Sequence, residues 1–249
     1  DNWGFVGFYN YTRLTSDPLF LKAIYNTFIY AFFTIFPNLL LGLLLATALN
    51  ESFKGRILFR TSIFLPYVTS MVAVSMVWLW IYEPSRGILN RFLNAIGMDM
   101  IPWLTDPKYA MGSIIVMSIW KGIGFNMVVF LAGLQSIPAS LYEAATVDGA
   151  SRFRQLISIT IPMLRPTTFF LFVINCINSF MVFEQVMIMT GGGPLDSTTT
   201  IVHQIYMNAF QKYQMGYAMS MAMILFLITS VITLANFRYG NQGQDLDVD

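Results

Sequence analysis

The chain has 249 residues, of which 56% are apolar and only 11% charged, against about 25% charged in an ordinary soluble domain. So few charges cannot cover the surface of a soluble protein of this size, which excludes a soluble enzyme of the common kind and a disordered protein. The 14 basic and 13 acidic residues nearly balance, so nucleic acid is not an expected partner. Continuous rather than alternating apolar runs predict an all-α, polytopic helical membrane protein and not a transmembrane barrel.

Five apolar stretches are long enough to cross a membrane, because about 20 helical residues span the hydrocarbon core. They cover residues 22–50, 61–82, 109–135, 165–189 and 214–237. Pro37 and Pro66 fall inside the first two, where we expect a kink, since neighbouring helices can satisfy the freed carbonyl groups.

Five spans place the two ends of the chain on opposite sides of the membrane. The ten-residue loop 51–60 carries three cations, which favours the cytoplasmic side for this loop, although cations divide almost evenly between the two sides overall. We therefore expect an extracytoplasmic lead-in over residues 1–21, a transmembrane domain over 22–237 and a cytoplasmic tail over 238–249.

The segment between the second and third spans predicts a short amphipathic helix that lies on the membrane or on the helix bundle. Apolar residues recur in it at helical spacing, and Gly97 follows them as a stop signal. These apolar residues are Ile88, Leu89, Phe92, Leu93 and Ile96.

The loop over residues 136–164 is the most polar stretch between spans and predicts two short helices joined by a glycine. Ser140 and Glu143 have the spacing of a capping box at the start of the first helix. Gly149 interrupts the pattern, and Ser151 can cap a second helix that ends near Pro162. From the residues alone, this hairpin is either a docking element on the membrane surface or an ordinary pair of loop helices.

The same loop resembles the EAA loop of the membrane-spanning (permease) subunits of binding-protein-dependent ABC importers. The shared pattern in this chain is Glu143-Ala144-Ala145, Gly149 and Ile159-x-Ile161-Pro162, with Ile161 where the family has Leu. In that family the loop is cytoplasmic and carries the coupling helix, which sits in a cleft of the ATPase subunit. The resemblance implies these ATPase-facing residues: Glu143, Ala144, Ala145, Asp148 and Gly149.

Three further stretches resemble carbohydrate permeases of the maltose and glycerol-phosphate type, and the resemblance covers nearly the whole chain. They are NYTRLTSDP near the start, FRTSIFLPY at 59–67 and TGGGP at 190–194. The resemblance implies a sugar or sugar-like solute, a second permease, two ABC ATPase subunits and an extracytoplasmic solute-binding protein. It also implies a multi-pass protein of a bacterial or archaeal plasma membrane. Such permeases usually have six or more spans, so we expect that an upstream span has been removed from this chain.

The glycine run at 191–193 is not a nucleotide-binding loop, because Pro194 and Leu195 follow it where a P-loop needs Lys and Ser or Thr. We therefore expect no cofactor on this chain, with ATP and Mg on separate ATPase subunits. The run is either a tight extracytoplasmic turn or a contact for the binding protein through Gly191, Gly192, Gly193 and Pro194. One cysteine and one histidine cannot build a metal site or a catalytic triad, so neither a metal nor an enzymatic activity is expected.

Polar residues within the third and fourth spans are candidates for the solute pathway, since burying them in a membrane is costly. The fourth span offers Asn175, Asn178, Phe180, Glu184 and Gln185, and the third offers Asn126. Helical spacing places Asn175, Asn178 and Gln185 near one face of the fourth span, as a polar stripe with Glu184 to one side of it. The candidate residues either line a wet cavity or hydrogen-bond between helices. Lys121, also in the third span, is a candidate functional residue because it is a charge within the membrane, and the alternative is that it extends to the membrane surface or pairs with a partner subunit.

Together these features predict the permease subunit of an ATP-driven importer. The alternative is a secondary transporter or channel that works alone. That alternative predicts an internal inverted repeat with paired broken helices, and the sequence contains no convincing repeat.

Overall fold

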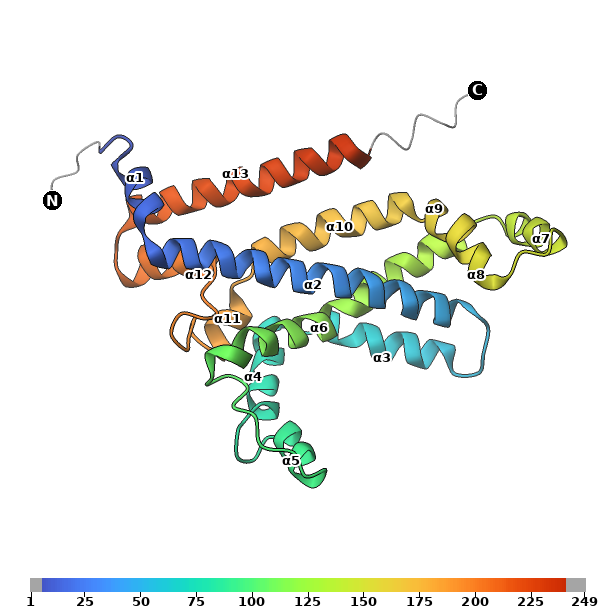
Figure 1. Cartoon of the computed structure of the whole chain (residues 1–249), viewed down its shortest axis with the longest axis horizontal. Coiled ribbons are helices and arrows are strands. Elements are labelled where there is room, and N and C mark those ends of the chain that lie inside the picture. The colour runs from blue at the N-terminus through green and yellow to red at the C-terminus, as the bar shows by residue number, and fades with distance from the viewer. Residues whose placement is uncertain (1–5, 241–249) are drawn as a thin grey trace. The chain divides into compact units, whose positions relative to one another are not determined.

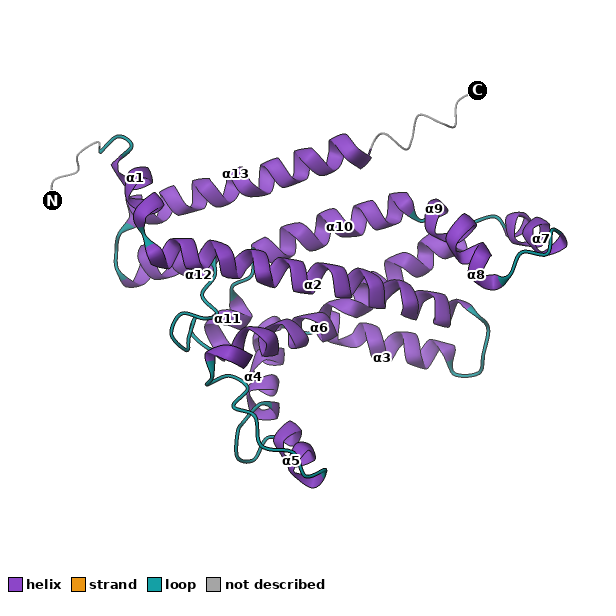
Figure 2. Ribbon diagram, viewed as in Figure 1, coloured by secondary structure: helices purple, strands orange, loops and turns teal. Residues whose placement is uncertain are grey.

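The computed structural model describes residues 6–240, which form helices and loops without a β-strand (Figures 1 and 2). The first half of the chain contains α1 (Tyr9–Ser16), α2 (Pro18–Asn50), α3 (Arg56–Val68), α4 (Met71–Ile81), α5 (Ile88–Ala95) and α6 (Pro107–Gln135). The second half contains α7 (Ala139–Val147), α8 (Arg152–Gln155), α9 (Ile161–Met163), α10 (Arg165–Phe180), α11 (Glu184–Met189), α12 (Ile201–Tyr206) and α13 (Met215–Gly240). Single π-helical turns follow α8 at Leu156–Thr160 and α12 at Met207–Gln211. The all-α fold is therefore confirmed.

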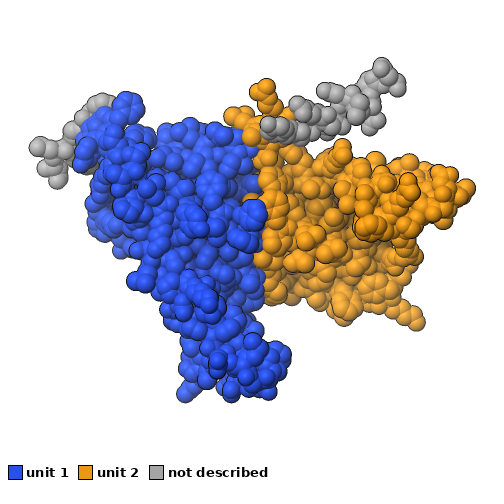
Figure 3. Space-filling view, in the orientation of Figure 1, with its two compact units in different colours: residues 1–34, 70–118, 176–232 blue, residues 35–69, 119–175, 233–249 orange. Residues whose placement is uncertain are grey.

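The chain divides into two compact units, coloured separately in Figure 3. The described part of unit 1 comprises residues 6–34, 70–118 and 176–232, and that of unit 2 comprises 35–69, 119–175 and 233–240. The core of unit 2 is built on Ala46, Leu49, Met127, Phe130, Leu131, Leu134, Ile137, Leu164 and Leu171. The core of unit 1 contains Leu14, Phe20, Ile201, Tyr217 and Met221. The long helices α2, α6, α10 and α13 each contribute residues to both units.

Three helices are long and apolar enough to cross a membrane without interruption, namely Pro18–Asn50, Pro107–Gln135 and Met215–Asn236. They match three of the predicted spans, and α2 stays helical through Pro37. Two bent helix pairs bring the possible number of spans to five. The predicted count of about five is thus consistent with the structure, although two of the spans are not single helices.

The second predicted span, 61–82, is wrong as a continuous helix. α3 ends at Val68, Thr69 is extended with φ −74° and ψ 152°, and α4 begins at Met71. Pro66 does not end the helix, because α3 continues for two residues beyond it.

The fourth predicted span, 165–189, is also wrong as a continuous helix. α10 ends at Phe180 and α11 starts at Glu184, with Phe183 in a non-helical conformation between them. On its other side, α10 forms a bent pair with the segment Arg152–Met163, at an angle of 64°.

The short amphipathic helix between the second and third spans is confirmed as α5, with Gly97 after it at φ +79°. A buried asparagine anchors this segment. The Asn90 amide donates to the carbonyls of Pro84 and Ile101, both at 2.9 Å, and its oxygen accepts from Trp103 Nε1 at 2.9 Å. Residues 84–103 are therefore held by their own hydrogen bonds.

Candidate functional site

The predicted hairpin of the 136–164 loop is present as α7, Gly149 and α8, beyond the ends of α6 and α10 (Figure 1). Gly149 has φ +76°, a conformation that favours glycine. Its N–H donates to Thr146 O at 3.1 Å, and the next N–H, of Ala150, donates to Ala145 O at 2.9 Å. This pair of bonds is the Schellman motif, which ends a helix and reverses the chain.

One of the two predicted helix caps is confirmed. The Ser151 side chain accepts a hydrogen bond from Arg154 N–H at 3.3 Å and starts α8. The capping box at Ser140 is wrong, because α7 already begins at Ala139 with Pro138 as its N-cap. Pro138 has φ −58°, and a proline's fixed φ suits the entry into a helix without any side-chain acceptor.

Side chains on the inner side of the hairpin hold it closed. Tyr142 and Thr160 share a hydroxyl–hydroxyl bond of 2.9 Å. The Gln155 amide donates to Thr146 Oγ1 and to Ala150 O, both at 3.1 Å. The hairpin is therefore preorganised.

The residues expected to face an ATPase lie mostly on the outer side of this hairpin. Glu143, Ala144, Asp148 and Gly149 are exposed, and Ala145 is half-buried. Two apolar side chains beside them are also exposed, Val147 at 88% and Phe153 at 71%. The sequence reasoning did not assign Phe153, although a large apolar residue two positions after the Ala150–Ser151 turn was a usable signal. Exposed apolar side chains next to a polar rim are typical of a protein-binding surface.

Two of the candidate pathway residues pair with each other within unit 2. Asn175 donates to Asn126 Oδ1 at 2.8 Å, and Asn126 donates back to Asn175 Oδ1 at 3.5 Å. Asn126 is fully buried, and a Cβ on Gly42 of α2 would lie only 2.6 Å from Asn126 Cβ. This geometry fits hydrogen bonding between helices and not the lining of a wet cavity, which was the other hypothesis for these residues.

The other four candidates belong to unit 1 and do not share one face. Gln185 is buried and donates to Tyr30 Oη at 2.8 Å, and Phe180 packs edge-on against Phe28 at 5.1 Å. Asn178 and Glu184 are exposed. The expected polar stripe from Asn175 to Gln185 is wrong, because the helix is interrupted after Phe180 and the side-chain periodicity does not continue across the break.

Lys121 does not extend to the surface, which was one of its expected positions. Its ammonium is buried and donates to the backbone carbonyls of Pro66, Tyr67 and Thr69 at 3.1, 2.9 and 2.7 Å. The partners are thus carbonyl groups of this same chain, at the end of α3.

The glycine run lies in a loop that other parts of unit 1 hold in place. The Lys22 ammonium donates to Leu195 O at 2.7 Å, and the Asn26 amide donates to Thr199 O at 2.9 Å. Gly192 has φ +85°, and a Cβ there would collide with the His203 ring. Leu195, at the tip, is 80% exposed.

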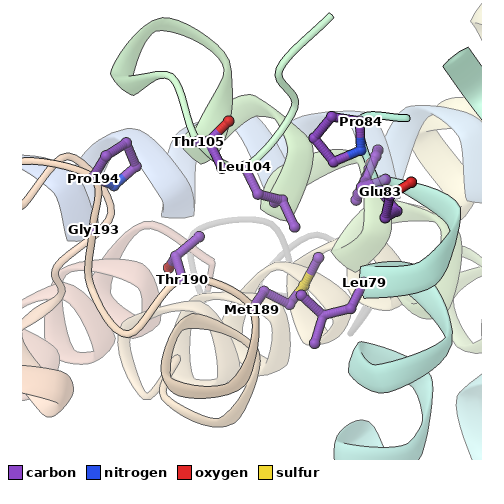
Figure 4. Close-up of a pocket in the computed structure, with 10 residues that line it drawn as sticks. Leu79, Glu83, Pro84, Leu104, Thr105, Met189, Thr190, Gly193 and Pro194 are labelled. Carbon is purple, nitrogen blue, oxygen red and sulfur yellow. The ribbon is translucent and has the colours of Figure 1, made fainter. Parts of the chain in front are cut away.

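Gly193 and Pro194 also line a pocket of about 540 Å³ within unit 1 (Figure 4). Most of its wall is apolar, from Leu79, Tyr82, Leu104 and Met189, and Thr105 and Thr190 add hydroxyl groups. Glu83, another lining residue, accepts from the backbone N–H of Arg86, which holds the pKa of its carboxyl below the ordinary value. Among residues 6–240, no three His, Cys, Asp or Glu side chains come together in a way that could hold a metal ion.

Comparison with known proteins identifies the family. Residues 38–245 match the family described as binding-protein-dependent transport system inner membrane component. The chain belongs to this family. It is a permease of a binding-protein-dependent ABC importer, and its EAA-type loop is the α7–Gly149–α8 hairpin.

Named relatives of this permease span most of its length. The probable ABC transporter permease YurN of Bacillus subtilis is 36% identical over 97% of this chain and 84% of its own length. The sn-glycerol-3-phosphate transport system permease UgpA of Agrobacterium fabrum is 36% identical over 94% of this chain and 80% of its own.

Two crystal structures share the fold of this permease. One is of a bacterial ABC transporter involved in the import of the acidic polysaccharide alginate, with TM-score 0.89, 30% identity and coverage of 97% of this chain and 85% of the matched chain. The other is of a bacterial alginate ABC transporter in complex with a periplasmic protein that carries an alginate pentasaccharide. Its TM-score is 0.86, with 30% identity and coverage of 93% and 81%.

Proposed function

We propose that this permease serves an importer for a sugar or sugar-like solute, in a bacterial or archaeal plasma membrane. The observation that carries the proposal is the likeness over nearly the whole chain to a glycerol-phosphate permease and to alginate transporters. These relatives handle polyhydroxylated solutes that carry a negative charge. The proposed solute class is therefore carbohydrates and their acidic or phosphorylated derivatives.

The proposed assembly contains this permease, a second and different permease, two ABC ATPase subunits and an extracytoplasmic solute-binding protein. ATP and Mg bind to the ATPase subunits, and this chain binds no cofactor and catalyses no reaction. Support comes from the hairpin, whose rigid, exposed outer face suits a subunit that receives a mechanical signal from a partner.

In this mechanism Glu143, Ala144, Ala145, Asp148 and Gly149 contact the ATPase, with Val147 and Phe153 as apolar anchors beside them. Small residues on α7 allow another backbone to approach closely. ATP binding to the ATPase subunits then shifts the permease between two states, one open to the outside and one open to the cytoplasm.

On the extracytoplasmic side, Gly191, Gly192, Gly193 and Pro194 contact the binding protein. The loop is already held by Lys22 and Asn26, so little ordering is needed on contact. For the pathway we retain Asn178 and Glu184, which are exposed, and assign Asn126, Asn175, Phe180 and Gln185 to helix packing beside it.

A secondary transporter or channel that works alone is the second candidate. The broken helices are the observation that favours it, since such transporters commonly contain discontinuous helices. It leaves the exposed hairpin face without a role.

The test is ATP hydrolysis by the complete assembly in vesicles, with its own binding protein loaded from a panel of solutes. We expect neutral sugars, sugar acids or glycerol phosphates to stimulate hydrolysis, and amino acids to have no effect. Stimulation by amino acids alone would overturn the solute class, and uptake by the permease without ATPase subunits would support the second candidate.

A further inference from the structure

Lys121 is the central residue of the 29-residue helix α6, and its side chain is only 8% exposed. An ammonium group has three N–H donors. The carbonyls of Pro66, Tyr67 and Thr69 account for all three, at 3.1, 2.9 and 2.7 Å. Lys121 therefore has no free donor to offer to a solute.

These three carbonyls belong to the end of α3. The last carbonyls of a helix have no partner within the helix, and the chain leaves the helical conformation at Thr69. Within a membrane such unsatisfied groups are costly, and so is an uncompensated charge. The carbonyl end of a helix carries a partial negative charge. The ammonium and the helix end thus compensate each other.

Residues next to Lys121 in the sequence pack against the same part of α3. A Cβ at Gly124 would collide with the carbonyl oxygen of Ile63, so only glycine allows the two backbones to approach this closely. One residue further along, the Phe125 ring stacks on the Tyr67 ring at 4.8 Å and 19°. Lys121, Gly124 and Phe125 therefore all contact the second half of α3.

Pro66 alone does not account for the end of α3. The helix continues past it to Val68, and its carbonyl is itself one of the three acceptors. The Pro66 carbonyl also accepts from the Thr69 hydroxyl at 2.6 Å, but the side-chain donor to the Tyr67 and Thr69 carbonyls is Lys121 on α6.

We infer that Lys121 is a positioning residue for transport, a built-in cation that caps the carbonyl end of α3 and keeps the second span interrupted after Val68. The effect on turnover rests on the proposed function, whereas the capping of α3 does not. Because all three donors are engaged within this chain, Lys121 has none left for the solute or the binding protein. Replacing Lys121 should therefore change the rate of the transport cycle and not the affinity for the loaded binding protein.

The test uses the complete assembly in lipid nanodiscs and compares Lys121→Met, Lys121→Arg and Lys108→Met. Lys108→Met is the matched control, since Lys108 is in the same helix but lies over the Tyr109 ring. Amide hydrogen exchange is measured over residues 61–70. We expect Lys121→Met to accelerate exchange there about tenfold or more, equivalent to about 1.4 kcal/mol, and Lys121→Arg and Lys108→Met to stay near the natural protein.

ATP hydrolysis, titrated with the loaded binding protein, gives the functional readout. We expect Lys121→Met to lower the maximal rate with the half-saturating concentration unchanged, and Lys121→Arg to restore most of the rate. Unchanged exchange in Lys121→Met would overturn the capping, and a changed half-saturating concentration would overturn the positioning role. If Lys121→Met does not assemble, Lys121→Leu, which also lacks a donor, takes its place with the same expectations. If exchange is accelerated in Lys121→Met but the loaded binding protein does not stimulate hydrolysis in the natural protein, the capping of α3 stands and the proposed function is contradicted.

Discussion

Gly149 carries the bend of the α7–Gly149–α8 hairpin through its backbone conformation and its backbone N–H. Its φ of +76° is strained for residues with a side chain, and its N–H closes the helix on Thr146 O. A Cβ there would meet no neighbouring atom, so the strain is confined to the backbone.

We expect Gly149→Pro to lower stimulated ATP hydrolysis by roughly fivefold or more, because proline fixes φ near −65° and removes the N–H. Glu143→Lys should act similarly, through charge reversal on the exposed face of α7. Gly149→Asn is the control, since asparagine tolerates the left-handed conformation. ATP hydrolysis per assembled complex is the measurement, and normal hydrolysis in both Gly149→Pro and Glu143→Lys would contradict the docking role.

Asn175 and Asn178 are three residues apart, but the structure gives them different environments. We expect Asn175→Ala to reduce the yield and thermal stability of the assembly, by about 0.6–2 kcal/mol, because it removes the donor to Asn126 Oδ1, although Asn126 Nδ2 still donates to Gly122 O. Asn178→Ala should leave yield unchanged and lower solute uptake, since its side chain is exposed. Paired uptake and co-purification measurements decide. If uptake in Asn178→Ala falls only in proportion to the assembled complex, Asn178 is not in the pathway.

At the scale of elements, the segment around α5 depends on a single buried side chain. Asn90→Ala removes the partner of two carbonyls and of the Trp103 N–H, which should destabilise residues 84–103 by roughly 2–4 kcal/mol. Asn94→Ala is the matched control, since Asn94 is in the same helix but exposed, and it should change stability by less than about 0.5 kcal/mol. Hydrogen exchange over this segment measures both. Equal effects of the two variants would disprove the anchoring role.

His203, the only histidine in the sequence, packs against Gly192 of the glycine run. Burial lowers the pKa of His203, while the Asp196 carboxylate opposes the shift. The unfolded loop therefore binds a proton at a higher pH than the folded loop does. Stability is fully present above the unfolded pKa of about 6.5 and falls as the pH drops below it.

We expect hydrogen exchange over residues 190–204, corrected for its intrinsic pH dependence, to report a loop less stable at a pH of about 5.5 than at about 7.5. Gln at position 203 does not titrate, so His203→Gln should remove this pH dependence. Residues 84–103, which contain no histidine, serve as the internal reference. The same pH dependence in His203→Gln would show that another group is responsible.

For the whole molecule, the expected behaviour is that of one subunit among several. We expect the purified chain in liposomes to take up no solute, even down a gradient, because in the proposed mechanism separate ATPase subunits drive the transport cycle through the hairpin. Adding the second permease, the ATPase subunits, the binding protein and ATP should restore uptake. Downhill uptake of solute by the chain alone would contradict this prediction and favour a transporter that works by itself.

Much of this protein follows from the sequence because the physical signals are local. Long uncharged stretches predict α2, α6 and α13, since only helices of that length satisfy their backbone groups in a membrane. A glycine shortly before the capping residue Ser151 predicts the bend at Gly149, and the apolar period predicts α5. The EAA-type pattern in the 136–164 loop indicated the family that residues 38–245 then matched.

Only the tertiary structure decided where spans are interrupted and which polar residues meet. The apolar pattern is the same in a continuous helix and in an interrupted one. The interruption at Thr69 leaves no local signal, because the carbonyl freed there is satisfied by Lys121, 52 residues away in sequence. Likewise Asn175 meets Asn126 across 49 residues, while Gln185 meets Tyr30 across 155. The period of a helix predicts neighbours only within that helix. A charge or amide within a membrane must find a partner, and the fold alone determines which residue that partner is.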